Sequence, residues 1–539
     1  MEVIFSLNAG YRYFQQIFEP NFKFHLKKEN YHLVKESVEE RDVVINNSPH
    51  TTRYIGLCVP CRNVIMACYF YVGLWMYHQL SLRFLADTSE FACPAPKMIG
   101  VDEMKRNFPL LNPKYNWGVV VYDGEMDDSR LLMETLLTST VDNYKPGMKG
   151  ANVLNYATFE NFIKDSNGKI VGIEFYDKVR QKKMTVRAKH VVNAAGNFSD
   201  VIRKKDDPNC KRRILHALGS HAILDGSFCS RNMGLLIPKT SDGRVLFFVP
   251  WLQSTIVGTT DFVVKEPAIH PTPTKDCISF IKKEATNLYP IFEEKPFEDF
   301  VRSKWSGIRP LVLPTEELAA KEDSEISSKD VARTHLILES NSGLISVMGG
   351  KWTIFRKMGE DTLLHILKRS NPNIKEVPKD SSTRNLRTIG DYRETRGSRL
   401  YLDKRRDHEA YIANFVKELY SRHSTFGLPL LNHLARSYGI RSLDVIDIAS
   451  KNPKLLERVH PEFEVIKAEL VYQIRKEMVV NVMDLLLRRN RIAFMDGSAA
   501  KAVMPTVIDI LGDEVGWDVA AKKKHLAEAS ELYSKMEFN

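Results

Sequence analysis

The chain has 539 residues, of which 43% are hydrophobic and 27% charged, a balance that suits a globular protein of two to four domains and excludes a mostly disordered chain. Its net charge of +10 and its pI near 9.0 favour an anionic partner, such as a phosphorylated metabolite, acidic lipid or nucleic acid, without choosing among them. Seven cysteines, an odd number spread thinly, argue against a disulfide framework, and no nucleic-acid-binding motif accompanies the basic charge, so we expect no nucleic-acid partner.

The first residues, MEVIFSLNAGYRYF, do not predict a targeting signal. They lack the basic segment and the long apolar stretch of a secretory signal peptide. They are also not rich in Arg and Ser, as a mitochondrial presequence would be. We therefore expect the chain to begin in the middle of a larger fold.

Cys58 and Cys61 form a lone C-x-x-C pair. Because no second pair and no nearby histidine accompanies them, buried thiols are a better interpretation than a metal or redox site. We therefore predict no metal centre in this protein.

Residues 63–82 contain no Asp, Glu, Lys or Arg. Their number approaches the ~20 residues that a membrane-spanning helix needs, but polar residues and five aromatic rings dilute the apolar character. Aromatic rings and polar ends suit the headgroup layer of a membrane better than its hydrocarbon centre. A helix that lies on a membrane surface is the first interpretation, a buried helix of a soluble fold the second, and a true span the third.

Two long stretches are typical of β-structure. Residues 151–196 alternate in the manner of strands, with a hairpin predicted at positions 167–168 and a last strand that ends on small residues. Residues 244–261 are typical of two strands joined by a turn.

Gly349 and Gly350 stand between a short apolar strand at 344–348 and a helical pattern that begins near Lys351. Such a turn can receive an anion or a flat ring, because glycine permits close approach and the first N–H groups of a helix carry partial positive charge. Lys351 adds a full charge. A phosphate and a redox cofactor that gains negative charge both fit this pattern, and an ordinary strand–helix turn is the alternative.

The character of the sequence changes after residue 368. Residues 370–399 are polar, are interrupted by Pro and Gly, and are typical of a linker. Residues 400–539 repeat apolar positions at helical spacing. We therefore predict a mixed α/β body over residues 1–369, a linker, and a helical C-terminal domain.

Five motifs follow one another in an order that a known family shares. They are GYRYF, YDGEMDDSRL, VVNAAGNFSD, WSGIRPL and GGKWTIFRKM. Together with the segments MGLLIPKTSDGRVLFFVPW and LLLRRNRIAF, they resemble the FAD-dependent glycerol-3-phosphate dehydrogenases of the mitochondrial and bacterial respiratory type. The resemblance extends over nearly the whole chain.

The resemblance implies an α/β fold in which an FAD/NAD(P)-binding Rossmann-like domain, incomplete at its N-terminus, is interleaved with an antiparallel-sheet substrate domain over residues 1–369. An all-helical domain follows at 400–539. The implied reaction oxidises sn-glycerol 3-phosphate to dihydroxyacetone phosphate, with hydride transfer to FAD and electrons passed to membrane quinone. The expected partners are glycerol 3-phosphate, quinone, a membrane surface on which the protein is peripheral, and a second copy of the chain in a homodimer. The expected location is the mitochondrial inner membrane.

The resemblance also implies roles for single residues. His221 would act as general base, because an imidazole titrates near neutral pH, while Arg309 and Lys351 would stabilise the negative charge that develops on the alkoxide and the reduced flavin. The substrate phosphate needs a cationic clamp, whose members would be Arg12, Tyr13 and Arg333. The cofactor would lie against Ala194, Ala195, Gly196, Gly349, Gly350 and Thr353.

Two departures from the family pattern stand at the N-terminus. The family has a strand–G-x-G-x-x-G–helix unit for the FAD pyrophosphate, and the 539 residues contain no such motif. Asn8-Ala9-Gly10 stands where the family has His-Gly-Gly. Either the sequence is a truncated version of a complete enzyme, or the protein is a shortened, catalytically inactive, membrane-associated relative.

A flavin amine oxidase, which would share the general fold, is a third interpretation. The cations Arg12, Arg309, Arg333 and Lys351 favour a phosphorylated substrate over an amino acid.

The motif LLLRRNRIAF brings Arg488, Arg489 and Arg491 close together. A lipid-facing surface, a partner-facing surface and a solvated basic face are the three interpretations of this cluster.

Overall fold

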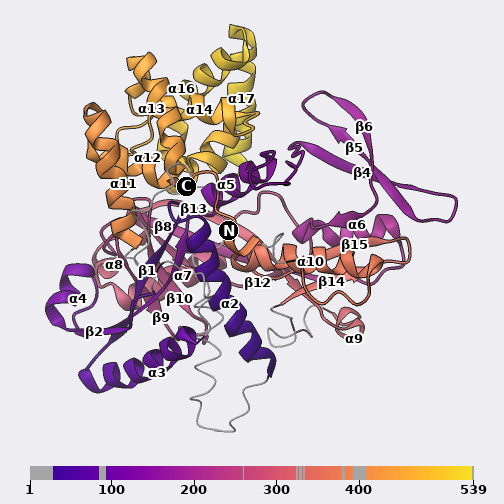
Figure 1. The fold of residues 1–539 in the computed structure, drawn as a ribbon. Helices are drawn as coiled ribbons and strands as arrows, with labels where there is room; N and C mark the ends of the chain where they lie inside the picture. The colour runs from indigo at the N-terminus through magenta and orange to yellow at the C-terminus, as the bar shows by residue number, and fades with distance from the viewer. Residues whose placement is uncertain are drawn as a thin grey trace.

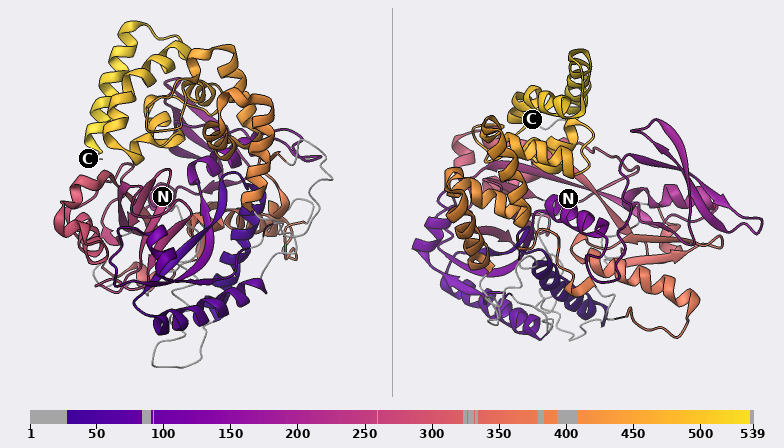
Figure 2. Two further views of the ribbon diagram at one scale, coloured as in Figure 1. Left: turned by 90° about the vertical axis from the view of Figure 1, so that its left-hand side faces the viewer. Right: turned by 45° about the horizontal axis from the view of Figure 1, so that its top comes forward.

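The computed structural model of the protein describes residues 28–83, 91, 93–258, 260–322, 326, 331, 334–378, 383–392 and 408–536, with side chains from residue 34 onward (Figure 1). The described residues form three β-sheets and a group of C-terminal helices, and the two views of Figure 2 show these helices gathered on one side of the sheet-containing body. The fold is thus the mixed α/β body with a helical C-terminal domain that the sequence predicts.

The largest sheet has the strand order β12-β8-β11-β10-β9-β1-β3-β2, and β13 pairs with the other edge of β8. Only β1 and β9 run parallel among the pairs described in this sheet, so the predicted antiparallel character is confirmed. Its strands are β1 (Thr52–Cys61), β2 (Lys97–Ile99), β3 (Trp117–Met126), β8 (Ile214–Asp225), β9 (Met233–Ile237), β10 (Leu246–Trp251), β11 (Ser254–Gly258), β12 (Phe262–Val264) and β13 (Val301–Val312).

The second sheet has the order β14-β15-β7 and joins distant parts of the chain. In it β15 runs parallel to β7, with Leu344 opposite Val191. The body is therefore interleaved, because the large sheet takes β1–β3 from before β7, and takes β8–β13 from between β7 and β14. The strands are β7 (Val191–Asn193), β14 (His335–Glu339) and β15 (Leu344–Gly349).

The third sheet, β4-β5-β6, extends outward from the body (Figure 1). Its first two strands form an antiparallel hairpin around residues 167–168, as the sequence predicts. The turn expected within residues 244–261 is also confirmed, because Trp251 pairs with Ser254 across a two-residue connection. The strands are β4 (Ala157–Lys164), β5 (Ile170–Asp177) and β6 (Lys182–Arg187).

Helices cover the sheets of the body, and a second set follows residue 407. The body helices are α2 (Lys28–Asn47), α3 (Val64–Leu82), α4 (Val101–Asn107), α5 (Asp128–Thr140), α6 (Ser199–Asp206), α7 (Lys275–Leu288), α8 (Ile291–Glu294), α9 (Glu316–Ala319) and α10 (Phe355–Ser370). The C-terminal α-helices are α11 (His408–His423), α12 (Leu428–Tyr438), α13 (Ser442–Lys451), α14 (Lys467–Lys476), α15 (Ile492–Met495), α16 (Gly497–Val515) and α17 (Val519–Lys535).

The C-terminal helices share a hydrophobic core with the large sheet. Trp251 and Trp305 of the sheet belong to the same buried cluster as Leu485, Val507 and other residues of the helical domain. The helical pattern predicted for residues 400–539 is interrupted after α14. Met478 adopts a left-handed φ of 52°, and a π-helical turn follows at Asp484–Arg489.

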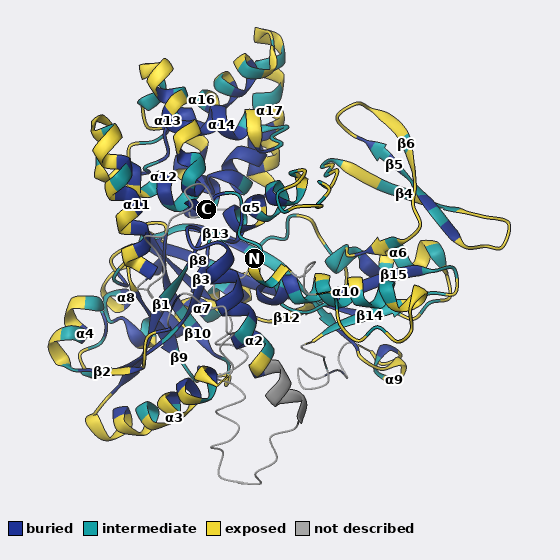
Figure 3. Cartoon of the chain, in the orientation of Figure 1, coloured by how far each residue is buried: buried dark blue, intermediate teal, exposed yellow. Residues whose placement is uncertain are grey.

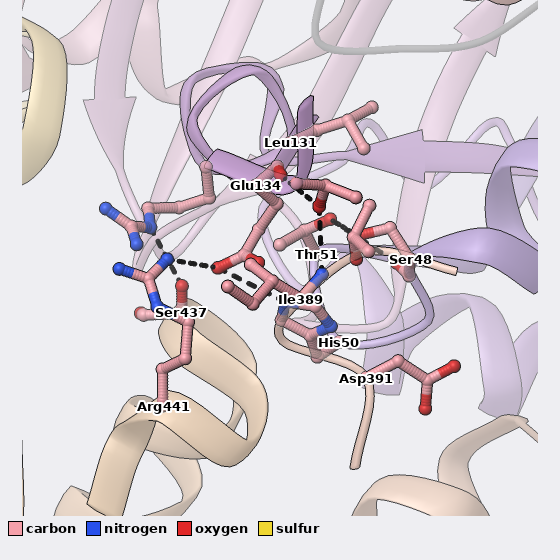
Figure 4. A network of polar contacts seen from close by, with 12 residues as sticks. Ser48, His50, Thr51, Leu131, Glu134, Ile389, Asp391, Ser437 and Arg441 are labelled. Carbon is pink, nitrogen blue, oxygen red and sulfur yellow. Dashed lines mark hydrogen bonds and ion pairs between the residues drawn. The ribbon is translucent and has the colours of Figure 1, made fainter. Parts of the chain in front are cut away.

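Buried charges also cross the junction between the body and the C-terminal helices. Arg130 of α5 donates two hydrogen bonds to the Glu477 carboxylate, at 2.8 and 2.7 Å, and a third to the backbone oxygen of Ser437 at 2.8 Å. Figure 4 shows the neighbouring part of this junction, where Arg441 pairs with Glu134 at 3.1 Å and His50 lies 3.7 Å from the same carboxylate. Removing a partner from such a buried pair leaves an uncompensated charge.

The predicted interpretations of the arginine cluster are wrong for two of its three members. Arg491 is buried against Asp127, Asp128 and the ring of Trp251, and Arg489 is buried where it donates to the backbone oxygen of Glu477. A solvated or lipid-facing surface therefore does not describe them. The sequence pattern could not reveal this, because the acidic partners of Arg491 lie more than 360 positions away.

Cys58 and Cys61 are both buried in β1 as free thiols, as predicted. Residues 64–82 form the helix α3, which Asn63 caps by accepting a hydrogen bond from the Met66 N–H at 2.9 Å. Within the described parts of the chain, no helix combines the length and the apolar character that crossing a bilayer requires.

The junction predicts a large effect of removing one charge. Glu477→Gln should lower the free energy of unfolding by about 3–5 kcal/mol, because Arg130 would stay buried without its carboxylate. Urea unfolding followed by far-UV circular dichroism measures this. The control is Glu514→Gln, which removes an equally bidentate but exposed pair with Arg475 and should cost at most about 1 kcal/mol. Equal losses in the two variants would contradict the prediction.

Candidate active site

The strand–glycine–helix turn predicted around Gly349 and Gly350 is present. β15 ends at Gly349, both glycines have left-handed φ values of 68° and 77°, and a short 3-10 turn at Trp352–Ile354 leads into α10. A Cβ atom at Gly349 would lie 2.2 Å from Cγ2 of Val312, and one at Gly350 would lie 2.7 Å from Sδ of Met358. Backbone conformation and packing against the protein's own side chains therefore both require glycine here, whatever else approaches the turn.

The second glycine turn, after β7, has a more open face. Gly196 has a left-handed φ of 56°, and a Cβ atom placed there would meet nothing within 4 Å. Ala194 is exposed, and Ala195 and Gly196 are half-buried. Small residues thus leave the main chain accessible at this turn.

Two buried hydroxyl groups lie where the helices after these turns begin. Thr353 follows the Gly349–Gly350 turn and Ser199 is the first residue of α6, and neither hydroxyl has a hydrogen-bond partner within the described structure. Because buried hydroxyl groups normally have a partner, these positions indicate that a further polar group belongs there. With the open turn at Gly196, they fit the polar edges and phosphates of a dinucleotide cofactor.

The two turns adjoin the same strand, β13. Asn197, the residue after Gly196, donates a hydrogen bond to the backbone oxygen of Ile308 at 2.6 Å. Gly349 packs directly over Val312 of that strand. The structure therefore brings the two predicted cofactor turns to the segment that carries Arg309.

Along β13, Arg309 lies between Ile308 and Val312, the two residues that the turns contact. Its Nη1 donates a hydrogen bond to the backbone oxygen of Thr260 at 3.0 Å and is 3.5 Å from Oδ1 of Asp261. The side chain is about one-quarter exposed, so it is largely enclosed but still accessible. Lys351, half-buried, immediately precedes the 3-10 turn.

His221 lies on β8 opposite Trp305 of β13, and its ring packs against the indole with a centroid distance of 4.4 Å. Its Nδ1 is buried and has no hydrogen-bond partner among the described residues. Burial holds the pKa of His221 well below 6.5, and the positive charge of Arg309 lowers this pKa further. The imidazole is therefore neutral near pH 7, the form that can accept a proton.

Arg12, Tyr13 and Arg333, the predicted phosphate clamp, lie outside the described residues. Asp128 and Arg130, from the motif YDGEMDDSRL, lie at the junction with the C-terminal helices, where they pair with Arg491 and Glu477. Sequence reasoning missed Asn197, whose contact with β13 depends on the fold. It also missed Trp305 as the neighbour of His221, although the strand patterns of both segments are visible in the sequence.

Comparisons with family models and with known proteins identify the family of this chain. Residues 26–356 match the model of the FAD dependent oxidoreductases, and residues 397–522 match that of the C-terminal domain of alpha-glycerophosphate oxidase. The chain is 31% identical to the mitochondrial glycerol-3-phosphate dehydrogenase of Rattus norvegicus, over 98% of the chain and 67% of that protein. It is 32% identical to a probable mitochondrial glycerol-3-phosphate dehydrogenase of Dictyostelium discoideum, over 95% of the chain and 75% of that protein.

The chain belongs to the FAD-dependent glycerol-3-phosphate dehydrogenase family. A solved structure agrees with this assignment. The fold matches the X-ray structure of the glycerol-3-phosphate dehydrogenase from Bacillus halodurans complexed with FAD, with a TM-score of 0.68 and 25% identity, over 92% of this chain and 84% of that one. FAD is the cofactor of this family. The two glycine turns of this chain have the shape and the polar groups to hold such a dinucleotide.

The depressed pKa of His221 predicts a dependence of stability on pH. Below about pH 6.5 the unfolded chain binds a proton at this position that the folded chain does not, so the stabilising contribution of the neutral ring is complete above 6.5 and decreases as the pH falls. The free energy of unfolding should therefore decrease more steeply between pH 7.5 and 5 in the wild type than in His221→Gln. Urea titrations at several pH values measure both slopes, and parallel slopes would show that His221 is not held neutral.

Proposed function

We propose that this chain oxidises the C2 hydroxyl group of sn-glycerol 3-phosphate to the ketone of dihydroxyacetone phosphate, with FAD as the cofactor. The observation that carries the proposal is the convergence of two glycine turns on β13, the strand of Arg309. The names of the relatives, which are glycerol-3-phosphate dehydrogenases, supply the substrate. When bound, FAD would supply the hydride acceptor that this oxidation needs.

The roles of the chain's own residues follow from their charge and placement. His221 accepts the hydroxyl proton, since its half-buried imidazole is neutral at physiological pH. Arg309 and Lys351 stabilise the negative charge that grows on the alkoxide oxygen and on the flavin. The substrate phosphate is bound by Arg12, Tyr13 and Arg333. The cofactor is held by Ala194, Ala195, Gly196, Gly349, Gly350 and Thr353.

We further propose that the protein is peripheral on the mitochondrial inner membrane and passes electrons to quinone. The outward face of α3 supports this placement. Ile65, Tyr69, Val72 and Trp75 are exposed there, with exposed fractions of 79, 60, 55 and 46%, and α3 contains no charged residue. Figure 3 shows this exposed face, and Figure 2 shows α3 on the side of the body away from the C-terminal helices.

An apolar helix face that carries tyrosine and tryptophan is typical of a helix lying in the interfacial layer of a membrane. Arg62 and Arg83, both exposed, flank α3 and would meet anionic headgroups. A homodimer stays a prediction, and self-association through the same face is the outcome that competes with membrane binding.

A spectrum of the purified protein tests the reaction. We expect flavin absorption that glycerol 3-phosphate bleaches without oxygen, and a bleaching rate about 10²–10³-fold lower in Arg309→Ala and in Lys351→Ala. Lys524→Ala, which removes an exposed cation on α17, should bleach at the wild-type rate. Colourless, inactive preparations of both this chain and an N-terminally extended one would favour the alternative, a catalytically inactive membrane-associated relative.

Sedimentation with lipid vesicles tests the membrane proposal. The variant Ile65→Glu/Val72→Glu should bind vesicles of phosphatidylcholine and phosphatidylglycerol at least ~10-fold more weakly than wild type, because two apolar side chains no longer enter the interface. The control is Val519→Glu, which places the same charge at an exposed apolar position of α17. Unchanged binding by the double variant would reject α3 as the docking helix, and a loss of dimers instead would assign the face to self-association.

A further inference from the structure

Gly219 is an interior residue of β8 whose identity the backbone does not explain. Its φ lies outside the left-handed region, so any residue could adopt its conformation. Glycine in the interior of a strand weakens that strand, because it adds no side-chain contact and loses more conformational freedom on folding. The presence of glycine at position 219 must therefore be explained by the atoms around it.

The guanidinium group of Arg309 occupies the space beside Gly219. A Cβ atom at this position would lie 2.7 Å from Nη2, 2.8 Å from Cζ and 2.8 Å from Nη1 of Arg309. The register explains the contact, since Arg309 pairs with Ala217 and Gly219 is its diagonal neighbour two positions along β8. All three close contacts are to the planar group, which therefore lies against the bare main chain of β8.

The other side of the guanidinium is held by the segment that follows β11. Nη1 donates to the backbone oxygen of Thr260, and Asp261 faces the same nitrogen at 3.5 Å. The Thr260 side chain fixes this segment, since its hydroxyl oxygen accepts a hydrogen bond from the Ser220 N–H at 2.9 Å and lies 3.3 Å from Sγ of Cys277. Thr260 is fully buried, so these contacts are shielded from water.

We propose that Gly219 and Thr260 are positioning residues, which hold the guanidinium of Arg309 in one orientation for the reaction. Gly219 supplies the space, and the hydroxyl of Thr260 anchors the carbonyl group that accepts from Nη1. The inference rests on the proposed function in one respect only, namely that Arg309 acts on the substrate. A long side chain held in advance loses little freedom when charge develops beside it, which is the condition for strong electrostatic stabilisation.

Gly219→Ala tests the inference in the full-length chain saturated with FAD. Its methyl group must displace the guanidinium, so kcat for glycerol 3-phosphate should fall by about 10²-fold while KM stays within about twofold. Gly359→Ala is the matched control, because a Cβ atom at that position in α10 meets nothing within 4 Å. It should retain wild-type kcat.

A double-mutant cycle separates positioning from general damage. If Gly219 acts through Arg309, Gly219→Ala should change kcat less than about twofold in an Arg309→Ala background. Labelling with phenylglyoxal, followed by peptide mass spectrometry, gives a readout that does not depend on activity: Arg309 should react faster in Gly219→Ala than in wild type. An undiminished effect in the Arg309→Ala background, or unchanged labelling, would overturn the inference.

A second pair of variants covers the case in which Gly219→Ala does not fold. Thr260→Ser keeps the hydroxyl group and should retain wild-type kcat, whereas Thr260→Val keeps the shape, loses both polar contacts and should lose activity and expose Arg309 to phenylglyoxal. Equal activity of the two variants would reject the role of Thr260.

The outcomes also distinguish the inference from the proposed function. If Arg309→Ala lowers kcat while Gly219→Ala and Thr260→Val do not, the proposed role of Arg309 stands and its positioning by these residues is wrong. If Arg309→Ala itself keeps wild-type kcat, the proposed role fails, and the positioning inference fails with it.

Discussion

The antiparallel pairing of β8 with β13 is the interaction on which the candidate site depends. It places His221 opposite Trp305 and Arg309 opposite Ala217, so the imidazole and the guanidinium project from neighbouring strands at a fixed separation. The same strand β13 receives the two glycine turns, one through Asn197 and the other through Val312. A shift of one residue in this register would turn each of these side chains to the opposite face of the sheet.

Electrostatics and burial act together at this pairing. The proximity of Arg309 opposes protonation of His221, and burial acts in the same direction. A neutral imidazole beside the guanidinium avoids the repulsion that two neighbouring positive charges would cause. The large sheet also shares its hydrophobic core with the C-terminal helices, so this geometry is supported from outside the body as well.

Local patterns predicted much of the fold, because alternation, glycine turns and helical spacing are properties of neighbouring residues. The hairpin at 167–168, the strand before Gly349 and the helical character after residue 407 are confirmed for this reason. The burial of Arg489 and Arg491 could not be predicted, because it depends on which distant groups the fold places beside them. Gly219 gave no signal, because the space that requires glycine is filled by a residue 90 positions further along. The roles of the individual site residues stay predictions.

The junction around Glu477 has a consequence for how the chain comes apart. The Glu477 carboxylate, at the C-terminal end of α14, binds Arg130 of α5 in the body. Arg491 of the C-terminal part binds Asp127 and Asp128 of the body. Separating the two parts would bring several charges and a large apolar surface into water in one step. The two parts should therefore unfold together and not one after the other. Proteolytic removal of the C-terminal helices should lower the stability of the oxidoreductase body as well.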